Sequence, residues 1–256
     1  MTTTGGPHLR VASWNVLADA YIKADWFPHT GAQLLAPGAR IDAVLALAMA
    51  LDADVLAFQE ADPALVAAAR TYLPGYDVRW CPKGRGRADG CLTAVRRPWT
   101  IMAEAQHLYE DGFGGPISGH VAHVLELRSD AGVAVSVANT HLRWAAPGTT
   151  GDTHVGVRQA WQLVGLLAGK ATAVIAADTN DSPDGPVRAV LRNSGFHEAT
   201  GLAPASIVAG TQVQAVDVVA ARGVRCTALP TGIRVQPPLP GPACPSDHVP
   251  VLTTIG

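Results

Sequence analysis

Residues 173–184 read A-V-I-A-A-D-T-N-D-S-P-D, an apolar run that stops at Asp178 and Asn180, with Pro183 close behind. The apolar half is typical of a buried strand. Many α/β enzymes present a carboxylate and an amide at the C-terminal end of such a strand, beside a cleft. A simple turn is the alternative, because Asp and Asn side chains both bond to nearby backbone.

An earlier part of the chain repeats this arrangement. Apolar residues recur at helical spacing over 40–51, and the apolar strand that follows ends at Gln59 and Glu60. A helix over 155–167 likewise precedes the strand that ends at Asp178. Two sheets packed face to face, with helices outside, would produce this repeat. No change of composition marks a linker, so we expect one α/β domain over residues 1–256, with its site at one common edge.

The composition indicates a globular protein, since 48% of the residues are apolar and 16% are charged. No apolar run approaches the ~20 residues that a membrane span needs, and residues 1–8 lack the pattern of a secretory signal. The cytoplasm is therefore the expected location, and no segment indicates an obligate protein partner. The four cysteines lack zinc-site spacing, and we expect buried or loop thiols.

A net charge of −2 argues against a protein that coats duplex nucleic acid. One segment is locally basic, however, and its cations are Arg79, Lys83, Arg85, Arg87, Arg96 and Arg97. A solvated surface loop would account for this segment. The functional alternative is a small cationic lip that attracts a phosphate-bearing substrate.

The chemically versatile side chains fall at the ends of expected strands: Asn15, Glu60, His141, Asp178, Asn180, Asp217, Asp247 and His248. Each has a structural alternative as a turn residue, a helix cap or a half-buried histidine. Together they provide what hydrolysis of a phosphate ester requires: oxygen ligands for a hard cation, a group that activates water, and donors for the phosphoryl oxygens.

Six motifs in order resemble the endonuclease/exonuclease/phosphatase superfamily, whose members include DNase I. They are A-S-W-N-V-L-A-D (12–19), D-V-L-A-F-Q-E (54–60), A-N-T-H-L (138–142), D-T-N (178–180), V-D-V (216–218) and S-D-H (246–248). Within the superfamily, W-N-V-L-A-D (14–19), D-G-C-L-T (89–93) and N-T-H-L-R-W (139–144) are most similar to the branch of deadenylases, nocturnin and 2′-phosphodiesterases. The resemblance implies a four-layer α/β sandwich, in which two mostly antiparallel sheets are flanked by helices.

The resemblance also implies a role for each side chain. Glu60 would be the principal ligand of Mg²⁺, or of Mn²⁺ in its place, with Asn15 beside it and Asp247 completing the shell. Asp178 would align or deprotonate the attacking water.

Three donors would serve the phosphoryl oxygens, namely Asn180, His141 and His248, and Asp217 would orient His248. Ala177 departs from the family, which usually has glycine before this aspartate. If that backbone needs a positive φ, alanine would be strained.

We therefore expect a Mg²⁺-dependent phosphodiesterase or nuclease that acts on RNA ends or short oligonucleotides. Its expected substrate contacts are Arg85, Arg87, Arg143 and Trp144. Trp80, Trp144 and Phe113 are candidate platforms for base stacking, although we expect core packing for at least two of the three.

Two alternatives remain. The first is a phosphatase of a small phosphorylated metabolite, such as a nucleotide, sugar phosphate or inositol phosphate. The second is a catalytically silent binding module, which would be expected to have lost counterparts of Glu60, Asp178 or His248.

Overall fold

The computed structural model describes residues 8–256, except for 147, 150, 200–205, 210, 211, 234 and 236–238. Its α-helices are α1 (Ala32–Leu35), α2 (Ile41–Ala50), α3 (Pro63–Tyr72), α4 (Val155–Leu166) and α5 (Pro186–Asn193). Three 3₁₀ turns accompany them: η1 (Asp19–Tyr21), η2 (Ala24–Trp26) and η3 (Gly151–Thr153).

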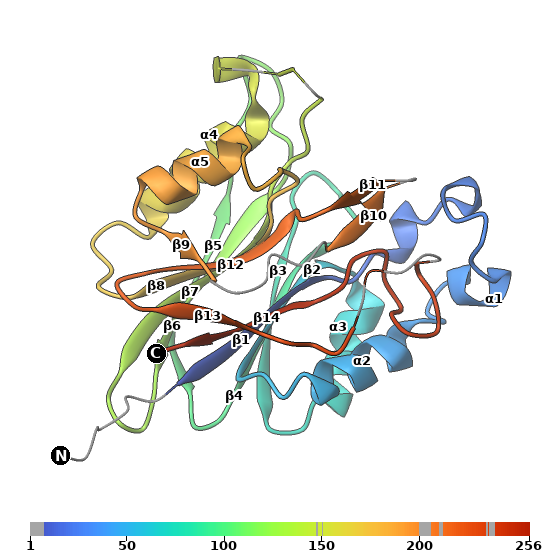
Figure 1. Ribbon diagram of the computed structural model, residues 1–256, viewed down its shortest axis with the longest axis horizontal. Coiled ribbons are helices and arrows are strands. Elements are labelled where there is room, and N and C mark those ends of the chain that lie inside the picture. The colour runs from blue at the N-terminus through green and yellow to red at the C-terminus, as the bar shows by residue number, and fades with distance from the viewer. Residues whose placement is uncertain are drawn as a thin grey trace.

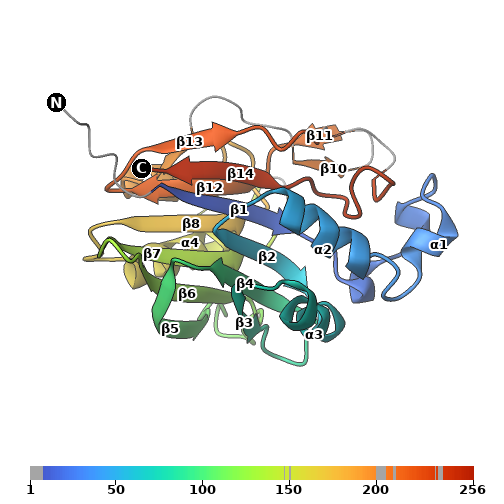
Figure 2. The same cartoon turned by 90° about the horizontal axis from the view of Figure 1, so that it is seen from below.

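Two six-stranded sheets form the centre of the molecule (Figures 1 and 2). The first sheet has the order β13 (Cys226–Leu229), β14 (Val251–Ile255), β1 (Leu9–Asn15), β2 (Val55–Ala61), β4 (Gly90–Arg96), β3 (Tyr76–Pro82). The second has the order β5 (Thr100–Leu108), β6 (Val121–Arg128), β7 (Ala134–His141), β8 (Ala173–Asp178), β12 (Asp217–Arg222), β9 (His197–Glu198). A separate hairpin pairs β10 (Ile207–Ala209) with β11 (Gln212–Gln214).

Each sheet contains one parallel pair, and the remaining pairs are antiparallel. In the first sheet β1 and β2 are parallel, with α2 between them in the chain. In the second sheet β7 and β8 are parallel, with α4 between them. The two sheets are therefore mostly antiparallel, as predicted, and the repeat of helix, strand and terminal carboxylate is confirmed.

The four layers enclose three large apolar clusters, and Cys81, Cys91 and Val121 form a small fourth one. The middle cluster lies between the sheets and includes Val11 and Val55 of the first sheet and Val137 and Val174 of the second. A second cluster packs α2 and α3 against the first sheet, and a third packs α4 and α5 against the other. In Figure 1 these two pairs of helices lie on opposite outer sides of the sandwich.

Two amides connect the sheets within this core. Gln59 Nε2 donates to Asn139 Oδ1 at 2.9 Å, and Asn139 Nδ2 donates to Leu92 O at 2.8 Å. Gln59 and Asn139 are fully buried, so these hydrogen bonds form without competition from bulk water.

Local signals account for several element boundaries. Asp62 caps α3 by accepting from the backbone N–H of Leu65 at 2.9 Å, and Pro63 occupies the first turn, as the sequence predicts. The four cysteines are free and buried. None of the helices in the described part of the chain combines the length and apolar character needed to cross a bilayer.

Two expected strands differ from those observed. The strand expected over 213–220 is divided into β11 and β12, because Ser206 Oγ takes the backbone N–H groups of Val216 and Asp217, each at 3.0 Å. The strand expected over 248–254 begins only at Val251. His248 precedes it, and its backbone N–H donates to Ser246 Oγ at 3.2 Å.

Candidate active site

The polar residues predicted from strand ends meet at one edge of the sandwich. The C-terminal ends of β1, β2, β7 and β8 supply Asn15, Glu60, His141 and Asp178. Because β12 runs antiparallel to β8, its first residue, Asp217, lies opposite Asp178.

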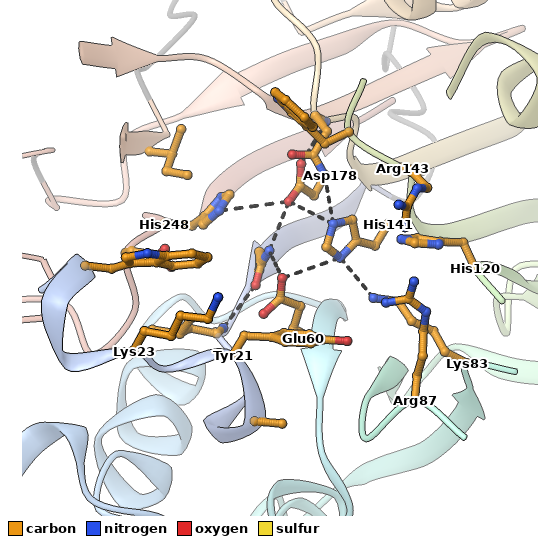
Figure 3. Close-up of a pocket in the computed structure, with 18 of the residues that line it drawn as sticks. Tyr21, Lys23, Glu60, Lys83, Arg87, His120, His141, Arg143, Asp178 and His248 are labelled. Carbon is orange, nitrogen blue, oxygen red and sulfur yellow. Dashed lines mark hydrogen bonds and ion pairs between the residues drawn. The ribbon is translucent and has the colours of Figure 1, made fainter. Parts of the chain in front are cut away.

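A pocket of about 430 Å³ opens at this edge (Figure 3). The predicted residues that line it are Asn15, Glu60, Arg87, His141, Arg143, Trp144, Asp178, Asn180, Asp247 and His248. Asp217 lies behind His248, and Arg85 lines a neighbouring cavity.

Asn15 connects the two central carboxylates. Its Nδ2 donates to Glu60 Oε1 at 3.1 Å and to Asp178 Oδ2 at 2.9 Å. Its Oδ1 accepts from the backbone N–H of Leu17 at 3.0 Å, which fixes the orientation of the amide. The amide therefore turns its donor toward both carboxylates and sets the space between them.

Glu60 reaches the pocket through an irregular backbone. The register between β2 and β4 shifts between Phe58 and Ala61, and Glu60 has a φ of 57°. A bulge of this kind re-aims a side chain, and a non-glycine residue at positive φ is costly and concentrates at functional sites. Asn180 has a φ of 49°, whereas Ala177 has no positive φ and continues β8. Alanine in place of the usual glycine is therefore unstrained.

Burial changes the acidity of both carboxyl groups. It raises the pKa of Glu60 to about 7, and the negative charge of Asp247 contributes to the increase. Burial also raises the pKa of Asp178, and the charge of Asp217 adds to it. A positive charge nearby would therefore stabilise the ionised form of both carboxyl groups.

The side chain of His248 can provide this positive charge. Burial by itself lowers its pKa, but the charge and hydrogen bond of Asp217 raise the pKa well above the usual value. Nδ1 of His248 lies 2.7 Å from Asp217 Oδ2, and Nε2 lies 3.9 Å from Asp178 Oδ2. Oxygen and nitrogen atoms of these three residues fall within 4.8 Å of one another, as in a metal site. Because the imidazole already binds Asp217 and favours its protonated form, the group is better suited to hold a proton.

His141 remains neutral on the other side of Asp178. Burial lowers its pKa well below the usual value, and the charge of Lys83 acts in the same direction. Its Nε2 lies 2.8 Å from Asn180 Nδ2, and its Nδ1 lies 3.4 Å from Lys83 Nζ. Asn180 Nδ2 also donates to Leu142 O at 2.9 Å, which fixes that amide.

The burial of Lys83 argues against the alternative of a solvated surface loop. Its side chain is 1% exposed and forms an ion pair of 2.5 Å with Asp89, which is 0% exposed. The hydroxyl of Tyr21 donates to the same carboxylate at 2.7 Å. Tyr21 and Asp89 were not predicted as site residues, although Asp89 opens the D-G-C-L-T motif (89–93).

The basic lip is smaller than predicted. Arg79 pairs with Asp77, and Arg96 pairs with Asp52 and Asp54, away from the pocket. Of the six cations, Lys83 and Arg87 line the pocket, and Arg85 and Arg87 line the neighbouring cavity.

Other pocket residues were not predicted, among them His120 and Lys23. His120 packs edge-on against His141, with ring centroids 5.5 Å apart. Burial lowers the pKa of His120 to about 2, and the nearby positive charges of Lys83, Arg87 and Arg143 contribute. Figure 3 shows these four residues together on one side of the carboxylates, with His248 on the other. An isolated histidine just before a strand carries no sequence signal for such a position.

The three candidate aromatic platforms differ in exposure. Trp80 packs against the core of the first sheet. Trp144 is 60% exposed and lines the pocket, and Phe113 is 46% exposed beside it. The expectation that at least two of them pack in the core was wrong, because their loops end at the rim of the site.

The sequence of the chain matches one known protein family. The family model described as "Endonuclease/Exonuclease/phosphatase family" matches residues 12–248. No curated protein sequence matches the chain.

Several solved structures have the same fold. One is ANGEL2, described as a 2′,3′-cyclic phosphatase, with a TM-score of 0.81 and 17% identity over 97% of this chain and 95% of that one. The human Nocturnin catalytic domain has a TM-score of 0.74 and 19% identity over 98% and 93%. A Bacteroides thetaiotaomicron mannosyl-6-phosphatase has a TM-score of 0.71 and 18% identity over 97% and 99%. These likenesses support the DNase I-like α/β sandwich.

Proposed function

Because the chain belongs to the endonuclease/exonuclease/phosphatase family and is a phosphoric ester hydrolase, we propose that it is a Mg²⁺-dependent phosphodiesterase of RNA ends or short oligonucleotides. The observation that carries this proposal is the arrangement of the pocket. Two buried carboxylates, Glu60 and Asp178, face a space bordered by the cations Arg87, Arg143 and His248. We further propose that residues 1–256 form one catalytic domain, acting in the cytoplasm, where buried free thiols are common.

The donor set around Glu60 fits a hard divalent cation. Glu60 and Asp247 are negative groups close enough for Asp247 to raise the pKa of Glu60, which a cation between them would reverse. Glu60 would be the principal ligand, with Asp247 as the second carboxylate and Asn15 beside them, holding Glu60 in place. Carboxylate oxygens are the ligands preferred by Mg²⁺, and Mn²⁺ accepts the same set. A bound Mg²⁺ supplies positive charge to the phosphoryl group.

Asp178 is the proposed base that orients the attacking water and accepts its proton. Its carboxylate is held by Asn15 Nδ2 on Oδ2 and by the backbone N–H of Asn180 on Oδ1, both at 2.9 Å. Its raised pKa makes it a stronger base than an exposed aspartate.

Three donors are proposed to stabilise the phosphoryl oxygens as they gain charge. His248 carries a proton on Nε2 toward the pocket, while Asp217 holds Nδ1 at 2.7 Å. Asn180 and His141 are the second and third proposed donors on the opposite side; Asn180 Nδ2 donates to Nε2 of the neutral His141 imidazole at 2.8 Å, so this contact would have to open for either group to donate to a phosphoryl oxygen.

A phosphatase of a small phosphorylated metabolite is the second candidate. Its support is the modest pocket, about 430 Å³, and the net charge of −2. The mannosyl-6-phosphatase with the same fold shows that this architecture accommodates a sugar phosphate in another protein.

A substrate panel separates the two candidates. It contains phosphomonoesters, simple diesters, and 2′–5′ and 3′–5′ oligonucleotides, each assayed with Mg²⁺, with Mn²⁺ and with a chelator. We expect metal-dependent shortening of at least one class of oligonucleotide. Hydrolysis of phosphomonoesters without any oligonucleotide being shortened would exclude the phosphodiesterase and favour the metabolite phosphatase.

The metal assignment has its own test. Glu60→Gln removes the negative charge but keeps the shape, so the Mg²⁺ concentration for half-maximal activity should rise roughly tenfold or more, the scale of one lost charge contact. Asp42→Asn, on the outer helix α2, is the matched control. An unchanged Mg²⁺ requirement in Glu60→Gln would contradict the assignment.

A further inference from the structure

A second cavity of about 320 Å³ adjoins the catalytic pocket. Arg87 and Arg143 line both, so they stand where the two spaces meet. Arg85, Phe113 and Ser118 are among the residues that line the second cavity alone.

Three arginines and one aspartate are the charged residues that the structure describes in the lining of this cavity. Within the described part of the chain, Arg85, Arg87 and Arg143 form no salt bridge. Asp111, the carboxylate among the described lining residues, has partners of its own. It is buried and accepts from Ser118 N at 2.7 Å and from Ser118 Oγ at 2.5 Å.

Gln159 bonds to two of the residues that line the cavity, Asp111 and Arg143. It is fully buried on α4, and its Nε2 donates to Asp111 Oδ2 at 2.5 Å. Its Oε1 accepts from the backbone N–H of Arg143 at 2.7 Å. Gly156, on the same helix, lies so close that a Cβ there would come within 2.9 Å of Arg143 O. The backbone that carries the Arg143 guanidinium is therefore fixed from two sides.

The loop that carries Arg85 and Arg87 is also held in place. Arg87 Nε donates to Ser118 O at 2.9 Å, and Gly84 N donates to Gly119 O at 2.8 Å. Gly119 has a φ of 87°, and a Cβ on it would lie 2.7 Å from Gly84 O, so glycine permits this approach. The arginines thus project from backbone that is already ordered, which reduces the entropy cost of holding a ligand.

Phe113 forms an ordered wall of the cavity. The guanidinium of Arg158 lies 4.1 Å from the centre of its ring, and Arg158 Nη1 donates to Gly112 O at 3.2 Å. Arg158 is thus a fourth cation beside the cavity, and its contact with Phe113 involves none of the three arginines that line the cavity.

We propose that this second cavity binds a second phosphate group of the substrate. Guanidinium groups bind phosphate oxygens through paired, charge-assisted hydrogen bonds, and the three that line this cavity form no salt bridge with any acid that the structure describes. The inference rests on the proposed function, because the first phosphate is the one hydrolysed beside Glu60 and Asp178. The preferred substrate is then a molecule with two phosphate groups, one in each cavity, bridged at Arg87 and Arg143.

The test compares substrates that differ by one phosphate. The dinucleotide UpU is compared with pUpU and with UpUp, and uridine 3′-monophosphate is compared with uridine 3′,5′-bisphosphate. The measured quantity is the ratio of kcat/KM with and without the extra phosphate. We expect a ratio of about tenfold or more for at least one pair, mainly through KM, as one charge-assisted contact would provide.

Arg85 is the residue to change, because it lines only the second cavity. Its φ is 61°, so Arg85→Asn is preferred to alanine, since asparagine tolerates this backbone. Arg85→Asn should bring the ratio close to one, and Arg70→Asn, an exposed arginine on α3, should leave it unchanged. The affinities of the same substrate pairs for the Asp178→Asn protein, measured by calorimetry, compare binding with and without the extra phosphate in the absence of turnover.

The outcomes distinguish this inference from the proposed function. If only the uridine monoesters are hydrolysed, the phosphodiesterase fails, and the bisphosphate pair still tests the second cavity. Equal kcat/KM and equal affinity within every pair would overturn the second phosphate site. A preference that persists in Arg85→Asn would also overturn it. If the extra phosphate is preferred only in UpUp or only in pUpU, the result identifies the side of the scissile bond that faces the cavity.

Discussion

The two strand–helix–strand units that meet at the site have the same construction but give their carboxylates different partners. In the first unit, β1–α2–β2, Glu60 faces Lys83, which is paired with the buried Asp89. In the second unit, β7–α4–β8, Asp178 faces His248, which is paired with the buried Asp217. Each carboxylate therefore has a cation in front of it, and each cation is anchored by a further carboxylate.

The difference lies in what each cation can do. An ammonium group offers donors only, whereas an imidazole can hold or release a proton near neutral pH. The Glu60 side is thus suited to a constant electrostatic task, such as balancing a metal site. The Asp178 side is suited to proton transfer and to the stabilisation of developing charge. In the proposed reaction, two units of similar backbone thus have separate roles.

The largest expected effect comes from breaking the second unit. Asp178→Asn removes the proposed base and should lower kcat by roughly 10²- to 10⁴-fold, the range for general base catalysis. His248→Ala removes one phosphoryl donor and should lower kcat by about 10²- to 10³-fold. Single-turnover rates at saturating Mg²⁺ measure both. Asp184→Asn, at an exposed position beyond the same strand, is the control. Near-normal turnover in both variants would refute the assignment of the site.

The second-largest expected effect is a loss of stability when the buried ion pair of the first unit, Lys83 with Asp89, is broken. Lys83→Met leaves Asp89 buried without its cation, and breaking a buried pair in this way costs about 3–5 kcal/mol of stability. Urea unfolding measures the change. The double variant Lys83→Met/Asp89→Asn removes both charges and should recover much of the loss. A single variant as stable as the parent protein would show that the pair is not needed to neutralise Asp89.

The smallest expected effect compares two histidines on opposite sides of the pocket. Burial lowers the pKa of His120 to about 2, whereas the pKa of His248 is raised by its carboxylate partners. In the unfolded chain His120 titrates near pH 6.5. Below that pH the unfolded state gains a proton that the folded state does not, so stability falls as the pH decreases.

This loss should amount to about 2 kcal/mol between pH 6.5 and pH 5, and His120→Gln should abolish that part of it. Denaturant unfolding at several pH values provides the measurement. His29→Gln, at an exposed position, is the control. Parallel pH profiles for His120→Gln and the parent protein would contradict the neutral, buried state of His120.

The elements that could be predicted from sequence are those with strong local signals. The apolar runs before Glu60 and Asp178 define β2 and β8, and Asp62 with Pro63 marks the start of α3. Because parallel strands end at a common edge, the polar residues that follow them could be placed together without coordinates.

The remaining features depend on tertiary contacts. The bulge that aims Glu60 follows from pairing between β2 and β4, and Ser206 divides a predicted strand by bonding to distant backbone. The sequence leaves Lys83 in either a solvated loop or a cationic lip, because its partner, Asp89, lies six residues on and meets it only when β3 and β4 pair. The local composition does not indicate such contacts, which form only when the chain folds.

The hydrogen bond between Gln59 and Asn139 has a consequence for how the enzyme tolerates change. Glu60 and Asp178 belong to different sheets, and this link lies one residue behind Glu60. The spacing of the reacting groups is consequently a property of the interior, set by how one sheet rests on the other. A substitution deep between the sheets can disable the enzyme while every residue of the pocket is intact, so its tolerance to mutation should follow the seam between the sheets as closely as the pocket itself.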